Sequence, residues 1–493
     1  MKSVYIRERK PYTKSELMTL FSEIDSNQLD LFIRNLKVYG ILKSVKGMPK
    51  NLELSNLVTL DEELVDGIDG QDNSCYVFNY VGIIIIEGYL LCCYPKYLFS
   101  HDNKDDKTEC RKLLKQVLKV LHRYNTNNQS IQLYSESNQL AAFSRIALII
   151  ALLDDYFQNG IYINTQSTHE LNGDGEINWN RTINFIHPMW QEEEPYYINL
   201  WTRKNTIDDK NFIQRIHECL LTYCSRELEE LTLLELLDIQ GVYLTDLLLE
   251  DLGDKEYLLH RISNELNIEF NSRKRYVLKL MSALIMEHSS VSDANNINLF
   301  GTNSFNLVWE GVCADVFDNK LKVPLSSLPL PQPVKIPNNI LDTKPKTLQD
   351  LIERPKWIST MNNIAFSDTL IPDLISVEQY GNGYSFVILD AKYYTMRLEN
   401  NKINGQPGIG DITKQYLYQL AYKDFIELNE IQHVKNCFLM PTEKDDITHI
   451  GYAQLEMLNK IGLEYIQVRE IPAHIMFEYY LQRRKMAISI LHL

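Results

Sequence analysis

The chain has 493 residues, more than a single hydrophobic core usually organises, so we expect two to four domains. Hydrophobic residues make up 45% of the sequence and charged residues 23%, which excludes an intrinsically disordered protein. The formal net charge of −15 excludes a uniformly basic nucleic-acid-binding domain, so any action on DNA requires local basic groups or a partner that holds the DNA.

The cysteines and the apolar runs indicate in which cellular compartment the protein is expected. The cysteines are scattered without a CxxC pair or a histidine cluster at metal spacing, which predicts buried thiols in a reducing cytoplasm. "MKSVYIRERKPYTK" lacks the apolar core of a signal peptide. The most apolar run, "YVGIIIIEGYLLCCYPKYL", is interrupted by Glu87, Gly88 and Pro95, so it predicts strands and not a membrane span. We expect a cytoplasmic protein without a membrane partner.

Residues 1–58 predict a small helical unit. Apolar side chains recur at helical spacing in "YTKSELMTLFSEIDSNQLDLFIRNLKVYGILKSVK", and "ILKSVKGMPKNLELSNLVTL" follows them. This arrangement is winged-helix-like. It is typical of a unit that docks on nucleic acid or protein, and an ordinary helical cap would give the same pattern.

The middle of the chain changes from strands to helices. Residues 59–133 predict a β-rich segment with a turn at Glu87-Gly88, followed by the helix "CRKLLKQVLKVLHRYN". Residues 134–296 predict a mainly helical domain, which "HELNGDGEINWNRTINFIHP" interrupts with a loop or a short hairpin.

Residues 297–493 predict an α/β domain with a mixed sheet. The helix "FNLVWEGVCADVF" is followed by strand-like runs in "TLIPDLISV", "YSFVILDAKYY", "VKNCFLMPT" and "LEYIQVREI". The helix "DITKQYLYQLAYKDFIEL" lies between the second and third of these runs. The whole chain is therefore expected to be a multidomain α+β protein.

Three charged residues meet in the hairpin predicted within this domain. "YGNG" at 380–383 joins two strand-like runs, and Asn-Gly is a strong hairpin signal. Asp373 and Asp390 are each about eight positions from the turn, so the hairpin places them opposite each other. Because side chains alternate along a strand, Lys392 lies on the same face as Asp390.

Two adjacent carboxylates repel each other unless a cation lies between them. Mg²⁺ binds one or two carboxylates together with phosphate and water oxygens, so Asp373 and Asp390 are candidate metal ligands, with Mn²⁺ as a possible substitute. Lys392 could orient an attacking water or stabilise a charged transition state. A surface hairpin with an incidental salt bridge is the alternative.

Two further residues are weaker candidates for a catalytic role. Gln415 belongs to a stripe with Tyr418, Gln419 and Tyr422 that could donate hydrogen bonds to phosphates or could simply face solvent, with Asp411 as the helix N-cap. Glu310, at the border of the apolar face of its helix, could add a third carboxylate or lie at a solvated helix edge.

These motifs resemble the PD-(D/E)xK nuclease superfamily, with Pro372-Asp373 and Asp390-Ala391-Lys392 as the motif residues. More specifically, the chain resembles the LlaJI-type restriction endonucleases, which are related to the McrC subunit of McrBC systems. That resemblance rests on "VGIIIIEGYLLCCYPKYL", "GEINWNRTI", "VWEGVCADVF" and "PGIGDITKQYLYQLAY". It implies that 59–133 is an McrC-like N-terminal domain and 297–493 an endonuclease domain.

The resemblance also implies a Mg²⁺-dependent DNA endonuclease of a bacterial defence system. Asp373 and Asp390 would bind the metal, Lys392 would be catalytic, and Gln415 matches a glutamine found in some branches of the superfamily. The implied partners are double-stranded DNA and an McrB-like AAA+ GTPase. The sequence contains no G-x-x-x-x-G-K-[ST] motif, so nucleotide hydrolysis would belong to that partner. The competing hypotheses are a repair or recombination nuclease and a non-catalytic regulator of an AAA+ ring.

Overall fold

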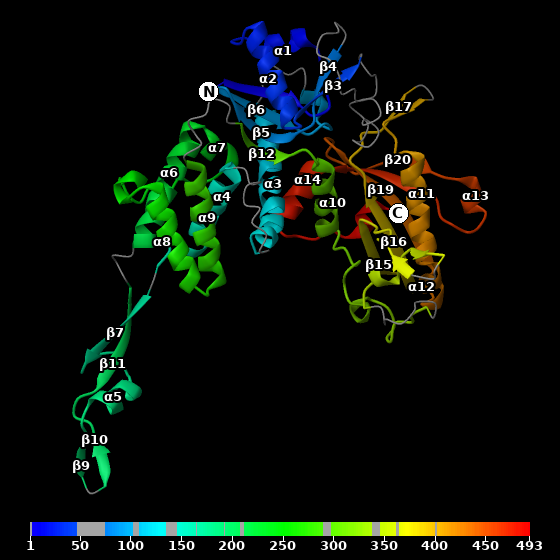
Figure 1. Ribbon diagram of the computed structural model, residues 1–493. Helices are drawn as coiled ribbons and strands as arrows, with labels where there is room; N and C mark the ends of the chain where they lie inside the picture. Colours follow the sequence, from blue (N-terminus) through cyan, green and yellow to red (C-terminus); the bar gives the residue numbers. More distant parts are fainter. Residues whose placement is uncertain are drawn as a thin grey trace. The chain divides into compact units, whose positions relative to one another are not determined.

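The computed structural model describes residues 2–46, 74–101, 108–134, 145–163, 165–191, 193–207, 212–288, 297–337, 346–360, 364–399 and 402–493. The protein is mixed α+β and divides into two compact units (Figure 1). Unit 1 comprises Met1–Asn128 and Leu299–Leu493, and unit 2 comprises Gln129–Asn298. The expected boundary at 58/59 lies outside the described residues, and the other domain limits stay predictions. Among the described helices, none combines the length and apolar character needed to cross a bilayer.

The N-terminal part of unit 1 contains a four-stranded sheet of order β1-β6-β5-β12, formed by β1 (Lys2–Arg7), β6 (Tyr89–Tyr94), β5 (Val81–Ile86) and β12 (Asn298–Thr302). The predicted β5–β6 hairpin is confirmed, with Glu87 and Gly88 both at positive φ in the turn. Strand β1, which pairs in parallel with β6, was missed because its charged residues obscure the period-two pattern.

Two short helices follow β1, as their capping residues dictate. Thr13 and Glu16 form a capping box at α1 (Lys14–Leu20), and Asp25 and Gln28 form another at α2 (Ser26–Val38). A three-stranded sheet of order β2-β4-β3 accompanies them, formed by β2 (Pro11–Tyr12), β4 (Ser74–Phe78) and β3 (Leu42–Lys46). The winged-helix assignment stays a prediction, because residues 47–73 lie outside the described ranges.

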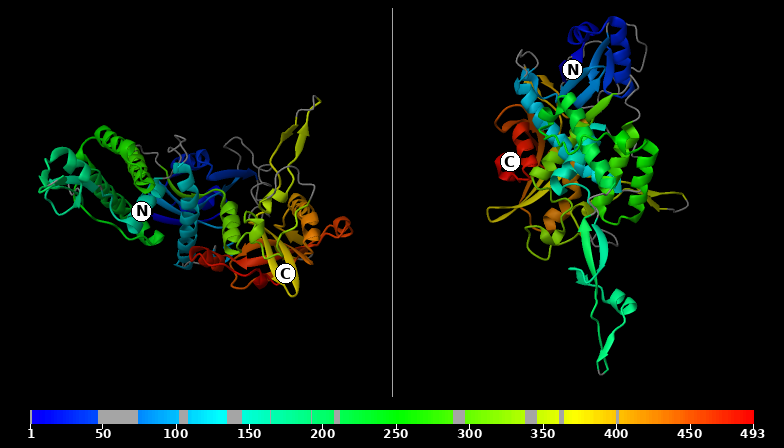
Figure 2. Two further views of the ribbon diagram at one scale, coloured as in Figure 1. Left: turned by 90° about the horizontal axis from the view of Figure 1, so that it is seen from below. Right: turned by 90° about the vertical axis from the view of Figure 1, so that its left-hand side faces the viewer.

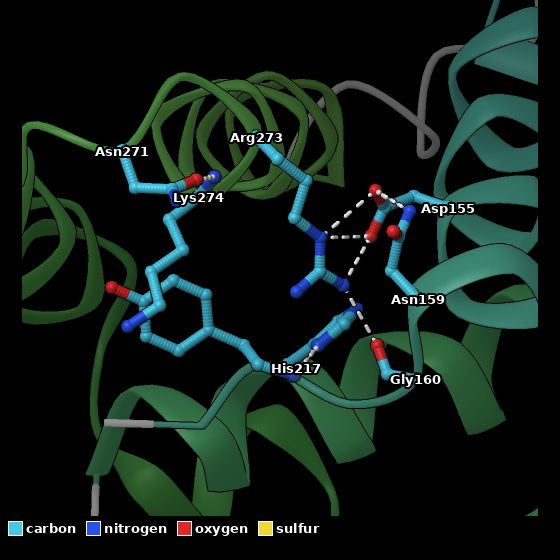
Figure 3. A network of polar contacts seen from close by, with 8 residues as sticks. Asp155, Asn159, Gly160, His217, Asn271, Arg273 and Lys274 are labelled. Carbon is cyan, nitrogen blue, oxygen red and sulfur yellow. Dashed lines mark hydrogen bonds and ion pairs between the residues drawn. The ribbon is translucent and has the colours of Figure 1, made fainter. Parts of the chain in front are cut away.

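Unit 2 is built on α-helices, as predicted, and Figure 2 shows them from two further sides. They are α4 (Arg145–Asn159), α6 (Phe212–Glu230), α7 (Leu233–Leu237), α8 (Lys255–Ile268) and α9 (Ser272–His288). Figure 3 shows a polar network that ties α4, α6 and α9 together. The Arg273 guanidinium donates to the Asp155 carboxylate and, at 2.8 Å, to the Gly160 carbonyl that follows α4. The main-chain N–H of Tyr162 donates to Nδ1 of His217 at 3.0 Å.

An antiparallel segment of unit 2, residues 165–207, is longer than the predicted loop or short hairpin. We call it the arm. It contains β7 (Thr165–Leu171), β8 (Glu176–Ile177), α5 (Trp179–Phe185), β9 (Met189–Gln191), β10 (Glu194–Tyr196) and β11 (Trp201–Ile207). The arm exposes an unusual density of large apolar side chains: Leu171, Ile177, Trp179, Ile183, Phe185, Met189, Trp190, Tyr196 and Ile198.

The C-terminal part of unit 1 contains the predicted mixed sheet. Its order is β15-β16-β19-β21-β20, formed by β15 (Leu374–Tyr380), β16 (Gly383–Ala391), β19 (His433–Thr442), β21 (Ile466–Pro472) and β20 (Thr448–Ala453). The three central strands are parallel and the outer pairs antiparallel. Because β16 and β21 are buried along their length, both faces of the sheet must be covered.

Helices α10 (Phe305–Val316) and α14 (Ala473–Leu481) lie on one face of this sheet, and α11 (Ile409–Ala421) and α12 (Lys423–Leu428) on the other (Figure 1). Val308, Trp309, Val312 and Val316 are all buried, as the helical spacing predicted. Helix α3 (Thr108–Tyr134) connects the two parts of unit 1, since Arg123 pairs with Asp315 of α10.

Candidate active site

The β15–β16 hairpin brings the two predicted acids to one end of the sheet. Pairing runs from Tyr380↔Gly383 at the turn to Leu374↔Leu389 at the open end. Asp373 therefore lies opposite Asp390, as the sequence predicted. The turn itself is Gly381-Asn382, shifted by one residue from the expected Asn-Gly, and Gly381 has φ +57°, which glycine adopts readily.

Charged groups gather around Asp390 at the end of β16. The Lys392 ammonium lies 2.7 Å from Oδ2 of Asp390 and 2.9 Å from Oδ1 of Asp411. Oδ2 of Asp373 accepts a hydrogen bond of 2.9 Å from the main-chain N–H of Ala391, which fixes this carboxylate beside the strand end. We call Glu310, Asp373, Asp390, Lys392 and Asp411 the acidic cluster.

The acidic cluster shifts the pKa values of its members. Burial, the Asp390 carboxylate and the Glu310 carboxylate together raise the pKa of Asp373 to about 9. Burial lowers the pKa of Lys392, but Asp390 and Asp411 outweigh this effect and raise it above its usual range. These shifts favour the charged form of Lys392 and the protonated form of Asp373 in the metal-free protein.

The donor set fits a divalent cation. Oδ1 of Asp390 is buried and accepts no hydrogen bond from an N–H or hydroxyl group among the described residues, and the carboxyls of Asp373 and Asp390 lie close enough to share a hydrogen bond when one is protonated. The raised pKa of Asp373 reflects the repulsion between the two carboxylates, which a bound cation would offset. Within the described ranges, no three His, Cys, Asp or Glu side chains form a complete metal site, so water or phosphate oxygens would have to complete the coordination.

Asp411 belongs to the acidic cluster, whereas the sequence predicted only an N-cap role for it, which is wrong. Gly408 is the N-cap of α11, and Asp411 lies in the first turn of that helix. The Tyr394 hydroxyl donates to Oδ2 of Asp411 at 3.1 Å, which leaves Oδ1 directed at Lys392. The sequence signal was partial, since the helix dipole favours a carboxylate in the first turn but no local pattern places it beside Lys392.

Gln415 lies behind the cluster and not within it. Its Nε2 donates to the Ile388 carbonyl at 3.4 Å and to Oδ1 of Asn436 at 2.5 Å, and its side chain is fully buried. No hydrogen bond between Gln415 and the acids is present among the described residues. Its catalytic role stays a prediction, while the observed contacts fix α11 against β16 and β19.

The exposed face of α11 is formed by leucines and not by the Gln/Tyr stripe. The whole stripe of Gln415, Tyr418, Gln419 and Tyr422 is buried, whereas Leu417 and Leu420 are exposed. The solvent-facing interpretation is wrong, because the tyrosine hydroxyls bond buried carbonyls, as Tyr422 does with Leu348. The phosphate-binding role of the stripe stays a prediction. The two exposed leucines line a cavity of about 650 Å³ on the far side of the helix from the sheet.

Glu310 of α10 is half-buried and faces the cluster. Burial and the Asp390 carboxylate raise the pKa of Glu310, while Lys392 opposes this effect. The structure therefore brings together four of the five residues that the sequence proposed for catalysis: Glu310, Asp373, Asp390 and Lys392.

Comparison with known proteins identifies the family to which the sequence resemblance pointed. The profile of the LlaJI restriction endonuclease family matches residues 80–350 and 334–479. The chain belongs to this family. A curated relative, the type II restriction enzyme BsuMI component YdjA of Bacillus subtilis (strain 168), is 26% identical over 408 residues and covers 80% of each chain.

Two solved structures also resemble this LlaJI-family chain. One is a half-complex from a tetradecameric assembly of Thermococcus gammatolerans McrB AAA+ hexamers with bound McrC, with a TM-score of 0.38, 12% identity and coverage of 98% of this chain and 99% of that chain. The other is the cryo-EM structure of the Thermococcus gammatolerans McrBC complex, with a TM-score of 0.25, 14% identity and coverage of 63% and 85%.

Proposed function

We propose that this LlaJI-family chain is a Mg²⁺-dependent DNA endonuclease subunit whose catalytic domain is the C-terminal part of unit 1, with a PD-(D/E)xK fold. The observation that carries the proposal is the pairing of Asp373 with Asp390 beside Lys392, with both carboxyls buried and close enough to interact strongly. A surface hairpin with an incidental ion pair would not bury these groups.

The chemistry follows from the acidic cluster. Asp373 and Asp390 would hold Mg²⁺, and Mn²⁺ could replace it because both ions prefer oxygen ligands. A bound divalent cation lowers the pKa of water and offsets charge on a phosphate. Lys392, held between Asp390 and Asp411, is fixed as a cation that can orient the attacking water or donate to a phosphate oxygen. Loss of one such group costs about 3–4 kcal/mol in the barrier.

We further propose that the chain acts with an AAA+ GTPase partner of the McrB kind, which supplies nucleotide hydrolysis and holds double-stranded DNA. Three observations support this part of the proposal. The net charge of −15 disfavours strong DNA binding by the chain alone. The Bacillus subtilis relative is named a component of a restriction enzyme, which implies further subunits. The arm exposes apolar side chains at a density typical of protein interfaces.

The arm is therefore the segment of unit 2 that we propose for partner contact. The sequence alone favours a different contact for the partner, the β-rich segment at 60–130, so the arm departs from that expectation. Trp190 is 70% exposed and Phe185 is 71% exposed, and aromatic residues of this kind often dominate interface energetics. A nuclease that acts on DNA entering a bacterial cell would do so in the cytoplasm.

Plasmid cleavage by the chain co-purified with its AAA+ partner tests the proposal. We expect cleavage in Mg²⁺ with GTP, and little or none with EDTA or without nucleotide. Asp390→Ala and Lys392→Ala should each reduce the rate by more than about a hundredfold while partner binding is retained. Wild-type cleavage by either variant would place the catalytic site elsewhere, and partner binding without any Mg²⁺-dependent cleavage would favour a non-catalytic regulator.

A further inference from the structure

Four charged side chains are buried together where β1 and β6 of the N-terminal sheet end. Arg7, Glu8, Arg9 and Lys96 are each at most 2% exposed. They lie close together because β1 and β6 are parallel, so the residues at and just after the ends of the two strands are neighbours. The main-chain N–H of Glu8 donates to the Tyr94 carbonyl at 2.9 Å, which continues this pairing beyond β1. We call these four residues the buried charge cluster.

The buried charge cluster contacts the residue directly after Lys392. The Tyr393 hydroxyl donates to Oε2 of Glu8 at 2.6 Å, a short bond of the kind formed with a carboxylate. The main-chain N–H of Lys96 lies 3.3 Å from the same Glu8 oxygen and 3.2 Å from the Tyr393 hydroxyl oxygen. Tyr393 is 3% exposed, so this contact is shielded from water.

A second route leads from Lys96 to the acidic cluster. The Lys96 ammonium lies 4.6 Å from the centre of the Tyr393 ring and 5.9 Å from that of Tyr394, both within the range of cation–π attraction. Tyr394 in turn donates to Asp411, the carboxylate that pairs with Lys392. The rings of both residues that follow Lys392 thus lie beside the Lys96 ammonium.

Stability alone is a poor explanation for this arrangement. Burial and the neighbouring Arg9 lower the pKa of Lys96 to about 7, and Glu8 only partly opposes them. Buried charges of this kind are often no more stabilising than apolar residues of similar volume. Arg9 also adopts φ +65°, a left-handed conformation that is unfavourable for a non-glycine residue. Costs of this kind concentrate at functional sites, where they fix a geometry.

We propose that Glu8 and Lys96 are positioning residues for the nuclease site: through Tyr393 and Tyr394 they fix the end of β16 and thereby the direction in which Lys392 points. This inference rests on the proposed function and extends it, because it makes the N-terminal sheet part of the catalytic geometry. A displacement of β1 or β6 would be transmitted to Lys392 by two routes, through Tyr393 and the main chain, and through Tyr394 and Asp411.

Tyr393→Phe tests the inference, since it removes one hydroxyl and keeps the ring. The matched control is Tyr162→Phe in unit 2, which also deletes a tyrosine hydroxyl bonded to a carboxylate, that of Glu265. A second pair, Glu8→Gln and Glu8→Ala, either keeps or removes an acceptor for Tyr393. Each variant is co-purified with the AAA+ partner, and single-turnover cleavage at saturating DNA, DNA affinity, Mn²⁺ affinity by calorimetry and the unfolding temperature are measured.

We expect Tyr393→Phe and Glu8→Ala to slow single-turnover cleavage about ten- to a hundredfold, as small misplacements of catalytic groups do. DNA Kd should stay unchanged, Glu8→Gln should recover most of the rate, and Tyr162→Phe should cleave like the wild type. Unchanged cleavage in Tyr393→Phe, with Lys392→Ala inactive, overturns this inference alone. Wild-type cleavage by Lys392→Ala overturns the proposed site and this inference with it. If Glu8 variants fail to fold, Tyr393→Phe and its Mn²⁺ affinity decide the matter.

Discussion

The ammonium of Lys392 lies 2.9 Å from Oδ1 of Asp411, a carboxylate contributed by a helix and not by the hairpin that carries the lysine. This contact joins α11 to the end of β16. Because Asp411 also accepts from Tyr394, its orientation is fixed from both sides. The lysine of the candidate nuclease motif is therefore positioned by residues outside the motif, which makes its geometry testable at several points.

Asp411→Asn keeps the shape of the side chain but removes its charge. Since charge-assisted hydrogen bonds are about twice as strong as neutral ones, Lys392 loses part of its orientation. We expect single-turnover cleavage to fall about tenfold, equivalent to about 1.4 kcal/mol in the barrier. Glu427→Gln is the control, because it removes a carboxylate from an exposed pair with Lys423 on α12 and should leave the rate unchanged.

Asp373→Asn should stabilise the metal-free protein while it abolishes cleavage. The pKa of Asp373 is raised from its ordinary value to about 9, so the folded state takes up a proton that the unfolded state releases. Stability of the wild type in EDTA should therefore fall as the pH rises from about 4 to about 9. The Asn variant lacks this dependence and should gain about 1 kcal/mol or more at neutral pH.

Urea unfolding in EDTA and in Mg²⁺ measures both effects of Asp373→Asn. Mg²⁺ should raise the unfolding free energy of the wild type and have little effect on the variant, since a ligand stabilises only the state that binds it. An Asn variant that Mg²⁺ stabilises as strongly as the wild type would remove Asp373 from the metal site.

Arg273→Ala should strongly destabilise unit 2. Nε of Arg273 lies 3.1 Å from both carboxylate oxygens of Asp155, and NH2 lies 2.6 Å from Oδ2 (Figure 3). The Asp155 side chain is 7% exposed, so the variant leaves a buried carboxylate without its cation and with only the Asn159 amide as a side-chain donor, at a cost of about 3–5 kcal/mol. Arg226→Ala, which breaks an exposed pair with Asp246, should cost less than about 1 kcal/mol in the same urea titration. Equal losses would contradict the structural role of the network.

The stability of unit 2 should decrease at acidic pH because His217 is buried in its neutral form. Burial and the nearby Arg273 lower the pKa of His217 to about 3. The unfolded chain therefore binds a proton near pH 6.5 that the folded unit excludes, and stability falls as the pH drops from about 6.5 to about 3. At about pH 5 the loss relative to neutral pH approaches about 2 kcal/mol.

His217→Gln should abolish most of this acid sensitivity, because glutamine does not titrate. His260→Gln, which changes an exposed histidine on α8, should retain the wild-type slope. Unfolding free energies at about pH 7 and about pH 5 provide the comparison. The same slope in wild type and His217→Gln would show that other groups control it.

The double variant Phe185→Ser and Trp190→Ser should weaken binding of the AAA+ partner without lowering the unfolding temperature. Both side chains are more than two-thirds exposed, so their removal opens no cavity. Tyr452→Ser with Met457→Ser removes comparably exposed apolar side chains from the C-terminal part of unit 1 and serves as the control. We expect co-purification to fail only for the arm variant, and failure of both would indicate a nonspecific effect.

Much of the C-terminal domain could be predicted because its signals are local. The turn residues at 380–383 and the apolar strands beside them determine the hairpin register, and the register alone brings Asp373 opposite Asp390. The spacing of Val308, Trp309, Val312 and Val316 likewise determined which face of α10 is buried. Period and turn chemistry act over a few residues, so a single sequence reveals them.

The tertiary structure alone decided which distant residues complete the candidate site. The face of α11 was predicted wrongly, because burial of Tyr418 and Tyr422 depends on carbonyl acceptors at Ile371 and Leu348 that no local pattern indicates. Strand β1 is stabilised mainly by its parallel pairing with β6. That pairing brings Glu8 to Tyr393, although hundreds of residues separate them in the chain. Sequence periodicity fixes a residue's place on its own element, whereas contacts between elements depend on how the elements pack.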